Sequence, residues 1–438
     1  MHDSYDVVVV GGGTAGVVAA LQSARAGART ALLEIGSQLG GTMTAGGVNF
    51  PGIFHAWGRQ IIAGIGWELV EQAVAMNSDV MPDFSVYPGS AGWTWPLGQH
   101  WRHQVKINGP LYAALAEEAC VDAGVELRYY EVPMGVKRSA DACWELRSCA
   151  AGEERLVRCH QLIDCTGDAS LCGLLGLERL REDTIQPGTL WYRLENCDIS
   201  DQDHAALQAR LNAAVASGQL LPTDLGTPGI AFNSFLRLCG NHIMDADSST
   251  AAGRTRTNIA GRQCMLRVLR FVRSVPGCEN ARIKAMQWQT AVRETWRVKG
   301  EVVIGVDDYV SGRFWPDAIC YAYYPVDLHD CHGVKPEQLS QGVVPTVPFR
   351  ALIPAGSSNI LVAGRCLSSD RLANSALRVQ APCMATGQAA GAAAALAAQR
   401  GCSPAQVPFA ELTALLRQHG AIVPEPPAAG GQTTPAGG

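Results

Sequence analysis

The first strand and the glycines after it constrain the fold more than any other feature of this 438-residue sequence. Asp6–Val10 is a run of mainly β-branched residues, typical of a strand buried in a parallel sheet. A GxGxxG pattern follows at residues 11–16, and the spacing of small and apolar residues predicts a helix over Thr14–Gly27. Arg29–Glu34 then resumes as a second strand. The sequence therefore opens with a βαβ unit.

The glycine pattern predicts a nucleotide-binding site of the Rossmann type. The first glycine makes the turn, the second lets the backbone approach a pyrophosphate, and the third lets the helix pack closely. The N-terminus of the helix then faces the phosphates. Glu34 ends the second strand at the position where a carboxylate accepts hydrogen bonds from a ribose hydroxyl group. The alternative, a glycine-rich turn without a nucleotide, is disfavoured by this carboxylate.

Further sheet patterns lie towards both ends of the chain, with a different pattern between them. A helix and a strand are predicted over Pro110–Tyr130, and strands over Leu162–Cys165 and Asn359–Ala363. Aromatic clusters and an arginine-rich helical stretch mark the middle of the chain. We therefore expect an α/β fold in which a discontinuous Rossmann-type domain (1–185 and 346–423) carries an inserted α+β substrate or cap domain (186–345), followed by a disordered tail (424–438) rich in Pro and Gly.

Composition and simple motifs exclude several functions. The net charge of −5 lacks the basic excess of a nucleic-acid surface, so no nucleic-acid partner is expected. The stretch Ala389–Ala398 is too short to span a bilayer, so we predict a packed helix and no transmembrane segment. No signal-peptide pattern opens the chain, and the 15 scattered cysteines suit reduced thiols, so a cytoplasmic location is expected. No HxxH or HExxH spacing supports a metal site.

Four motifs, in order, resemble those of flavoproteins of the glutathione reductase and succinate dehydrogenase/fumarate reductase superfamily. The glycine pairs of residues 40–49 resemble the loop that passes the pyrophosphate and the flavin edge. Residues 162–168 resemble the second flavin motif, a strand that ends in Thr-Gly, and residues 359–370 resemble the third. Residues 377–391 resemble the closing helix of the bacterial FAD-dependent oxidoreductase family, whose dipole stabilises negative charge on the reduced flavin.

The resemblance implies FAD as the cofactor and a defined set of contact residues. Succinate dehydrogenase-like enzymes attach their flavin to a histidine, and residues 36–49 contain none, so FAD should be bound non-covalently. The implied contacts are Gly11, Gly13, Thr14, Ala15, Gly16, Glu34, Gly41, Thr42, Thr44, Gly46, Gly47, Val132, Thr166, Gly167, Asp168, Gly364, Arg365, Asp370, Arg378, Gly387, Gln388 and Ala389.

The resemblance also implies an oxidoreductase, either a dehydrogenase or an oxidase, that transfers a hydride between a small organic substrate and flavin N5. The second redox partner would be oxygen, a quinone or a carrier protein. A disulfide reductase is disfavoured, because the chain has no cysteine pair after the glycine pair and no second GxGxxG after a strand. A binding protein of this fold that has lost its flavin is a further alternative, which the intact phosphate loop disfavours.

A flavin-dependent halogenase or monooxygenase is a third alternative. Residues 92–97 are similar to the tryptophan motif of flavin-dependent halogenases, but the proline comes one residue early. A hydrophobic lid or a packing motif is the better interpretation of this segment.

The candidates for the chemistry lie in the predicted insert. Flavin-dependent oxidation commonly needs a base for the substrate proton and a cation to orient an anionic group. The catalytic candidates are His329, Arg293 and Tyr324, with Asp327 close to His329 in sequence. Arg293, Glu294 and Arg297 have helical spacing, and a structural ion pair between Arg293 and Glu294 is an equal alternative. A structural role for His329 also stays open, and His100 and His103 rank lower.

Overall fold

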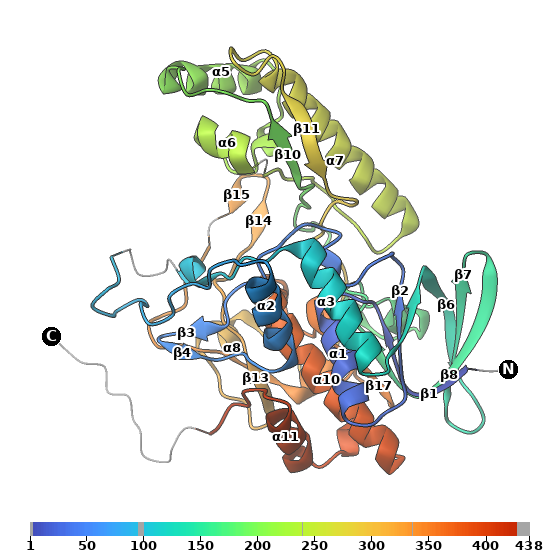
Figure 1. Cartoon of the computed structure of the whole chain (residues 1–438). Helices are drawn as coiled ribbons and strands as arrows, with labels where there is room; N and C mark the ends of the chain where they lie inside the picture. The colour runs from blue at the N-terminus through green and yellow to red at the C-terminus, as the bar shows by residue number, and fades with distance from the viewer. Residues whose placement is uncertain (1–2, 95–99, 239, 335, 427–438) are drawn as a thin grey trace.

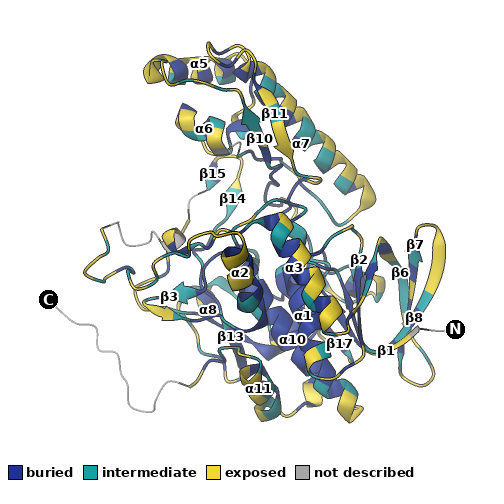
Figure 2. Cartoon of the chain, viewed as in Figure 1, coloured by how far each residue is buried: buried dark blue, intermediate teal, exposed yellow. Residues whose placement is uncertain are grey.

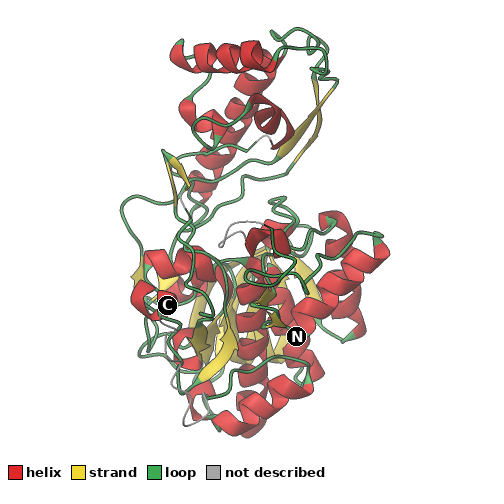
Figure 3. Cartoon of the chain, turned by 90° about the vertical axis from the view of Figure 1, so that its left-hand side faces the viewer, coloured by secondary structure: helices red, strands yellow, loops and turns green. Residues whose placement is uncertain are grey.

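A computed structural model describes residues 3–94, 100–238, 240–334 and 336–426. The chain forms a lower α/β lobe and an upper, mainly helical lobe that stands over it (Figures 1 and 3). Most of the predicted disordered tail, from residue 427 onwards, lies outside the described residues, as do Trp95–Leu97 of the halogenase-like segment. Among the described helices, none is both long and apolar enough to cross a lipid bilayer.

The lower lobe is built on one central sheet. Its parallel part has the order β5-β2-β1-β8-β17, in which β8 pairs with both β1 and β17. These strands are β1 (Asp3–Val10), β2 (Thr30–Glu34), β5 (Glu126–Tyr129), β8 (Glu153–Asp164) and β17 (Ile360–Val362). The predicted strands and the predicted α/β fold class are confirmed. The ends of β1, β2 and β8 lie at one edge of the sheet, where Rossmann-type folds bind their ligands.

The sheet also has an antiparallel extension, which the sequence analysis did not predict. The first half of β8 pairs with β7 (Trp144–Ala150), which pairs with β6 (Glu131–Arg138). Trp144, Leu146, Ser148 and Ala150 are buried along β7, whereas Glu145, Arg147 and Cys149 between them are more exposed. This alternation is the signature of a strand with one buried face, and it was available in the sequence.

Two helices pack against each other on the sheet with almost no space between them. These are α1 (Thr14–Arg25) and α10 (Gln380–Arg400), which are dark blue, and so buried, over most of their length in Figure 2. A Cβ atom added to Gly387 or Gly391 would overlap a backbone carbonyl oxygen of α1. The predicted packed helix at Ala389–Ala398 is therefore part of α10, and glycine is what allows the close approach.

Smaller elements complete the lower lobe. Its other helices are α2 (Ile65–Met76), α3 (Gly109–Asp122), α4 (Ser170–Leu174), α8 (Val306–Val310), α9 (Arg371–Leu377) and α11 (Phe409–Gln418). Short strand pairs are β3 (His55–Ala56) with β4 (Arg59–Gln60), β9 (Arg179–Leu180) with β12 (Arg297–Val298), and β13 (Ala318–Tyr321) with β16 (Thr346–Pro348). The hairpin of β14 (His329–Asp330) and β15 (Gly333–Val334) lies below the upper lobe (Figure 1).

The upper lobe has a hydrophobic core of its own. It contains α5 (His204–Ala216), α6 (Phe232–Leu238), α7 (Ala251–Val272), β10 (Tyr192–Glu195) and β11 (Arg282–Met286). Its buried core residues run from Leu190 to Ala281, whereas Ile304 to Val326 belong to the core of the lower lobe. The packing thus differs from the predicted insert, 186–345, because only the first part of that range forms a separate core.

Candidate functional site

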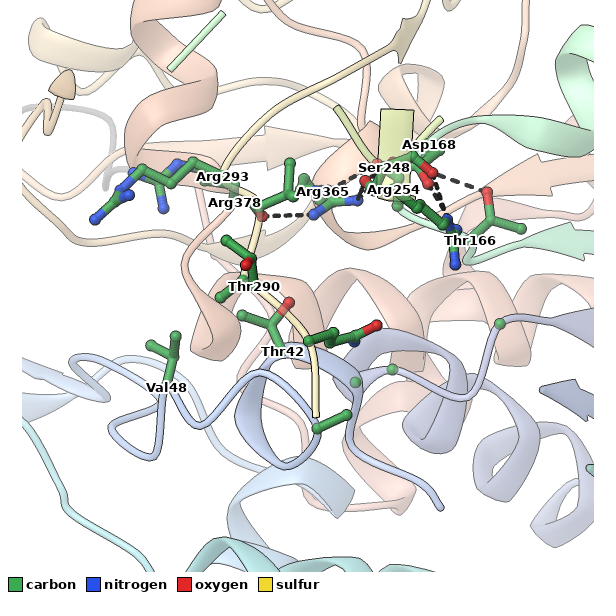
Figure 4. A pocket seen from close by; sticks show the side chains of 18 of the residues that line it. Thr42, Val48, Thr166, Asp168, Ser248, Arg254, Thr290, Arg293, Arg365 and Arg378 are labelled. Atoms are coloured by element: carbon green, nitrogen blue, oxygen red, sulfur yellow. Dashed lines mark hydrogen bonds and ion pairs between the residues drawn. The ribbon is translucent and has the colours of Figure 1, made fainter. Parts of the chain in front are cut away.

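A large cavity of about 1240 Å³ is lined by residues of both lobes. From the lower lobe, the glycine loop after β1, the end of β2 and the end of β8 contribute to its wall. From the upper lobe, the segment before α7 and the first turns of α7 contribute. Figure 4 shows part of this lining, with Thr42 and Val48 across the cavity from Arg293 and Arg378.

Glycine is present at three positions of the loop after β1 for different structural reasons. Gly11 has a φ of 101°, and a Cβ there would lie 2.5 Å from the backbone oxygen of Cys165. At Gly16, a Cβ would overlap the carbonyl oxygen of Gly11. At Gly13, no atom lies within 4 Å of an added Cβ, and the residue lines the cavity. The protein itself therefore does not need glycine at position 13, but a ligand that approaches the loop does.

The start of α1 adds to this binding surface. Gly13 is its N-cap and supplies no side-chain cap, so the first N–H groups of the helix lie beside the cavity. Thr14 and Ala15 also line the cavity. A helix N-terminus of this kind stabilises a phosphate group.

Glu34 holds the glycine loop and faces the cavity. Its carboxylate accepts hydrogen bonds from the backbone N–H groups of Gly12 and Gly36, each at 2.6 Å. Burial raises the pKa of Glu34, while these two hydrogen bonds act in the opposite direction. Each carboxylate oxygen accepts more than one hydrogen bond, so the group can also bind a hydroxyl group of a ligand.

A second glycine loop lies against the first. The N–H of Gly40 donates to the backbone oxygen of Gly12 at 2.8 Å, and Gly41 and Thr42 line the cavity. Thr44 is buried and donates to the Leu39 backbone oxygen at 2.6 Å. The sequence prediction thus located the loop, but only part of the loop reaches the cavity.

Asp168, after β8, joins the two lobes above the cavity. Its buried carboxylate accepts hydrogen bonds from Arg365 (2.6 Å), Ser248 (2.7 Å) and Thr295 (2.6 Å), and pairs with Arg254 of α7 at 3.2 Å. Figure 4 shows Arg365, Ser248 and Arg254 around the carboxylate of Asp168. The sequence prediction named Asp168 and Arg365, and missed the other three, because no local pattern connects such distant segments.

The catalytic candidates from the sequence lie together at one end of the cavity. Arg293, Tyr324 and His329 all line it. Asp327, which is close to His329 in sequence, and Arg378, which was predicted as an FAD contact, line the same end of the cavity. Arg293 and Arg378 lie side by side in Figure 4.

A chain of hydrogen-bonded groups runs through this end of the cavity. His329 Nε2 lies 3.1 Å from Asp327 Oδ2, and His329 Nδ1 lies 3.0 Å from His242 Nε2. His242 Nδ1 lies 3.1 Å from the backbone oxygen of Asp330. His242 comes from the loop between α6 and α7, and the sequence prediction missed it because no motif surrounds it.

The charges at this end do not cancel. Burial and the neighbouring Arg378 lower the pKa of Arg293 to about 9, which leaves its guanidinium charged at neutral pH. Burial works to raise the pKa of Asp327, but the hydrogen bond from His329 and the two arginines hold that pKa below its usual value. Burial lowers the pKa of His329 to about 4 and raises that of Tyr324 to about 12. Two cations therefore face one anion.

The predicted helical spacing of Arg293, Glu294 and Arg297 is wrong. The segment contains no helix, and Arg297 begins the short strand β12. Glu294 pairs with Arg371 at 2.9 Å rather than with Arg293, whose guanidinium instead donates to the backbone oxygen of Pro187 at 2.5 Å. Extended backbone sends neighbouring side chains to opposite faces, so Arg293 faces the cavity and Glu294 is buried behind it.

Eight of the predicted FAD contacts do not line the cavity, and packing explains most of them. Asp370 caps α9 by accepting from the N–H of Ala373 at 2.7 Å, and Gln388 donates to Gln22 at 3.1 Å inside the helical layer. A Cβ at Gly47 would lie 2.5 Å from Gln287. The predicted contacts outside the lining are Gly16, Thr44, Gly46, Gly47, Asp370, Gly387, Gln388 and Ala389, and the packing and capping contacts of several of them lie next to the site.

One of the lower-ranked histidines can be placed outside the site. His103 lies outside the cavity lining, with Nε2 at 2.7 Å from the backbone oxygen of Val86. Within the described residues, no group of three or more His, Cys, Asp or Glu side chains has the arrangement of a metal site.

The family described as FAD dependent oxidoreductase matches residues 6–416. A vinyl phenol reductase of Lactiplantibacillus plantarum is 58% identical over 41 residues, which is 9% of this chain and 8% of that protein. This match is too short to carry the activity of that enzyme over to the chain.

The similar solved structures are distant. A geranylgeranyl bacteriochlorophyll reductase-like protein of Thermoplasma acidophilum is 14% identical, with a TM-score of 0.41, over 95% of this chain and 84% of its own. The anhydrotetracycline hydroxylase OxyS of Streptomyces rimosus is 16% identical, with a TM-score of 0.27, over 44% of this chain and 38% of its own. Because the family match covers nearly the whole chain, the protein belongs to the FAD dependent oxidoreductase family.

Proposed function

We propose that this FAD-dependent oxidoreductase carries out the two-electron oxidation or reduction of a small organic anion, by hydride transfer at N5 of a non-covalently bound FAD. The observation that carries the proposal is the composition of one end of the cavity. There Arg293, Arg378, Tyr324, Asp327 and His329 lie together, in the same cavity as the glycine loop. A base, a hydroxyl group and excess positive charge are what such a reaction needs from the protein.

The residues of the cavity fit FAD. The open space at Gly13 and the uncapped start of α1 suit a pyrophosphate, and the carboxylate of Glu34 suits a ribose hydroxyl group. The N-terminus of α10 has no side-chain cap, and Val379, Gln380 and Cys383 from this end of the helix line the cavity. The amide oxygen of Gln380 is buried without a hydrogen-bond partner in the described part of the chain. A ligand N–H group would satisfy it.

Each residue at the polar end has a defined part in the proposed reaction. FAD, when bound, supplies the hydride acceptor or donor at N5. Arg293 and Arg378 attract and orient an anionic group of the substrate, because only Asp327 offsets their charge nearby. Tyr324 accepts a hydrogen bond from Gln104 at 2.8 Å, which leaves its own O–H free to donate to the substrate. His329, paired with Asp327, belongs to the group that holds the substrate proton.

An anaerobic substrate screen tests the proposal. The holoprotein would be mixed with a panel of amino acids, hydroxy acids and other small carboxylates, and flavin bleaching would be followed by absorbance. We expect bleaching by anionic compounds and none by their amide or ester analogues. Bleaching only by uncharged compounds would contradict the assigned role of the arginines.

We expect FAD to be released intact when the protein is denatured by acid or heat. Burial raises the pKa of Cys383 to about 12 and that of Cys165 well above its usual range, so neither cavity thiol is a nucleophile at neutral pH. Filtration of the denatured protein followed by mass spectrometry of both fractions measures the release. If flavin stays with the polypeptide, non-covalent binding is wrong, and the adduct would be mapped by peptide mass.

We expect NADH and NADPH to reduce the bound flavin poorly. The sequence contains no second GxGxxG after a strand that could bind a nicotinamide dinucleotide. Anaerobic stopped-flow reduction by each nucleotide measures the rate, and dithionite serves as the control that the flavin is reducible. Reduction by either nucleotide at more than about 1 s⁻¹, the low end of ordinary enzyme turnover, would contradict the prediction.

A further inference from the structure

Asp327, rather than His329, offers a free proton-accepting atom to the cavity. Both ring nitrogens of His329 are occupied, one by Asp327 and the other by His242. In Asp327, Oδ2 contacts His329 and, at 3.5 Å, Arg378, and the backbone N–H donates to Ser375 at 2.9 Å. Within the described residues, no hydrogen bond reaches Oδ1. The side chain is 16% exposed and lines the cavity, so a substrate can reach this oxygen.

The series of hydrogen-bonded groups that runs from the Asp327 carboxylate through the two histidine rings to the Asp330 carbonyl has three contacts. It holds too few protons for each contact to be a hydrogen bond. The Asp330 atom is a carbonyl oxygen, which only accepts, so His242 Nδ1 must carry a proton to bond it. The contact between the two rings needs a second proton, and the contact between His329 and Asp327 needs a third. Two neutral imidazoles carry two protons in total. With Asp327 ionised, one contact therefore joins two acceptors.

One additional proton satisfies every contact, and it neutralises the carboxylate of Asp327 rather than creating an imidazolium. If Asp327 is protonated, it donates to His329 Nε2, His329 Nδ1 donates to His242 Nε2, and His242 Nδ1 donates to the Asp330 oxygen. Each group then donates to the next one, from Asp327 towards the Asp330 oxygen. The carboxyl group needs only a half-turn about its terminal torsion to exchange Oδ1 and Oδ2, and this torsion has two equivalent positions.

We propose that Asp327 receives the substrate proton at Oδ1, and that His329 and His242 are positioning residues that make the carboxyl group a place where this proton is held. The inference rests on the proposed function. In the oxidation, the substrate O–H or N–H bond breaks and its proton bonds to Oδ1, while the electron pair of the adjacent C–H bond leaves as hydride to the oxidised cofactor. The substrate loses two electrons and two hydrogens, and the charge of Asp327 is neutralised.

The surrounding charges set when the proton is taken up. Arg293 and Arg378 face the hydrogen-bonded groups from two different segments, and Tyr324 adds a neutral hydroxyl group. Asp330 contributes its backbone oxygen and also the charge of its carboxylate, and both act to raise the pKa of His242 against the effect of burial. Burial acts to raise the pKa of Asp327, but the hydrogen bond with His329 and then the two arginines hold it below its usual value, and burial followed by the same arginines lowers the pKa of His329. In the free protein at neutral pH the chain therefore lacks its third proton. A substrate anion beside the arginines offsets their charge and favours uptake.

The replacement Asp327→Asn tests the proton count without a substrate. An asparagine amide donates to His329 Nε2, so it supplies the missing proton permanently, and each ring then carries its proton on Nδ1. In the parent protein the carboxylate instead keeps a proton on His329 Nε2. Nitrogen-15 histidine labelling of the FAD-loaded full chain, with two-bond ¹H–¹⁵N spectra, shows which nitrogen is protonated.

We expect Asp327→Asn to move the His329 proton from Nε2 to Nδ1, with FAD content and thermal unfolding unchanged. His242→Gln assigns the second ring, and His332→Gln, at an exposed histidine of the same hairpin, is the matched control with no effect on the two signals. If His329 keeps its Nε2 proton in Asp327→Asn, or if the two rings titrate independently in the parent, the inference is overturned. Failure of the substrate screen alone contradicts the proposed function and leaves this result standing.

Discussion

Replacing Gly13 with valine should give a folded protein that is purified without its yellow cofactor. The backbone of Gly13 has φ −67° and ψ −178°, a conformation that any L-residue adopts, and an added Cβ meets no protein atom within 4 Å. The new side chain instead fills the space where the pyrophosphate must approach the loop. Overlap of this kind costs about 1–3 kcal/mol, which is roughly 5- to 150-fold in affinity. The FAD-to-protein ratio from the absorbance of the denatured sample measures the loss.

Two control variants separate loss of binding from loss of folding. Gly135→Val in β6 adds the same side chain at another glycine with no neighbour within 4 Å, and should keep full occupancy. Gly11→Val should disrupt folding, because its φ of 101° and the nearby Cys165 oxygen both exclude a side chain. Full FAD occupancy in Gly13→Val would show that the glycine loop does not bind the pyrophosphate at this position.

The parts of the fold that the sequence predicts are those with a local pattern. The β1–α1–β2 unit follows from a buried apolar run, a glycine turn and helical spacing within about thirty residues. The strand β7 was missed although Trp144, Leu146 and Ala150 alternate with more exposed residues, because charged residues stand between the apolar ones. An antiparallel strand with one solvent-facing side, such as β7 between β8 and β6, tolerates such residues.

The residues of the site also divide into those that a local motif predicts and those that it does not. Glu34, Thr166 and Arg365 were predicted from motifs, and all three line the cavity. Asp370 was also predicted from a motif, but it lies outside the cavity lining and its side chain caps α9, a local role that the resemblance did not indicate. His242 carried no signal at all. It reaches His329 only because the loop before α7 lies over the β14–β15 hairpin, a contact between residues 87 positions apart.

Replacing His329 with alanine should lower the rate of flavin reduction per bound FAD by roughly two to four orders of magnitude, the usual range for the loss of acid–base catalysis, because the proton acceptor Asp327 loses the residue that positions it. The change leaves Asp327 without its hydrogen-bond donor at 3.1 Å and disconnects His242, so the substrate proton loses the chain that would hold it. FAD content should be unchanged, because the glycine loop and Glu34 lie in other segments. Anaerobic stopped-flow reduction with a compound from the substrate screen measures the rate, and His332→Ala is the control from the same hairpin. If His329 is structural, the variant loses stability or flavin instead, and a rate within about twofold of the parent contradicts the assigned role, since the loss of acid–base catalysis costs far more than that.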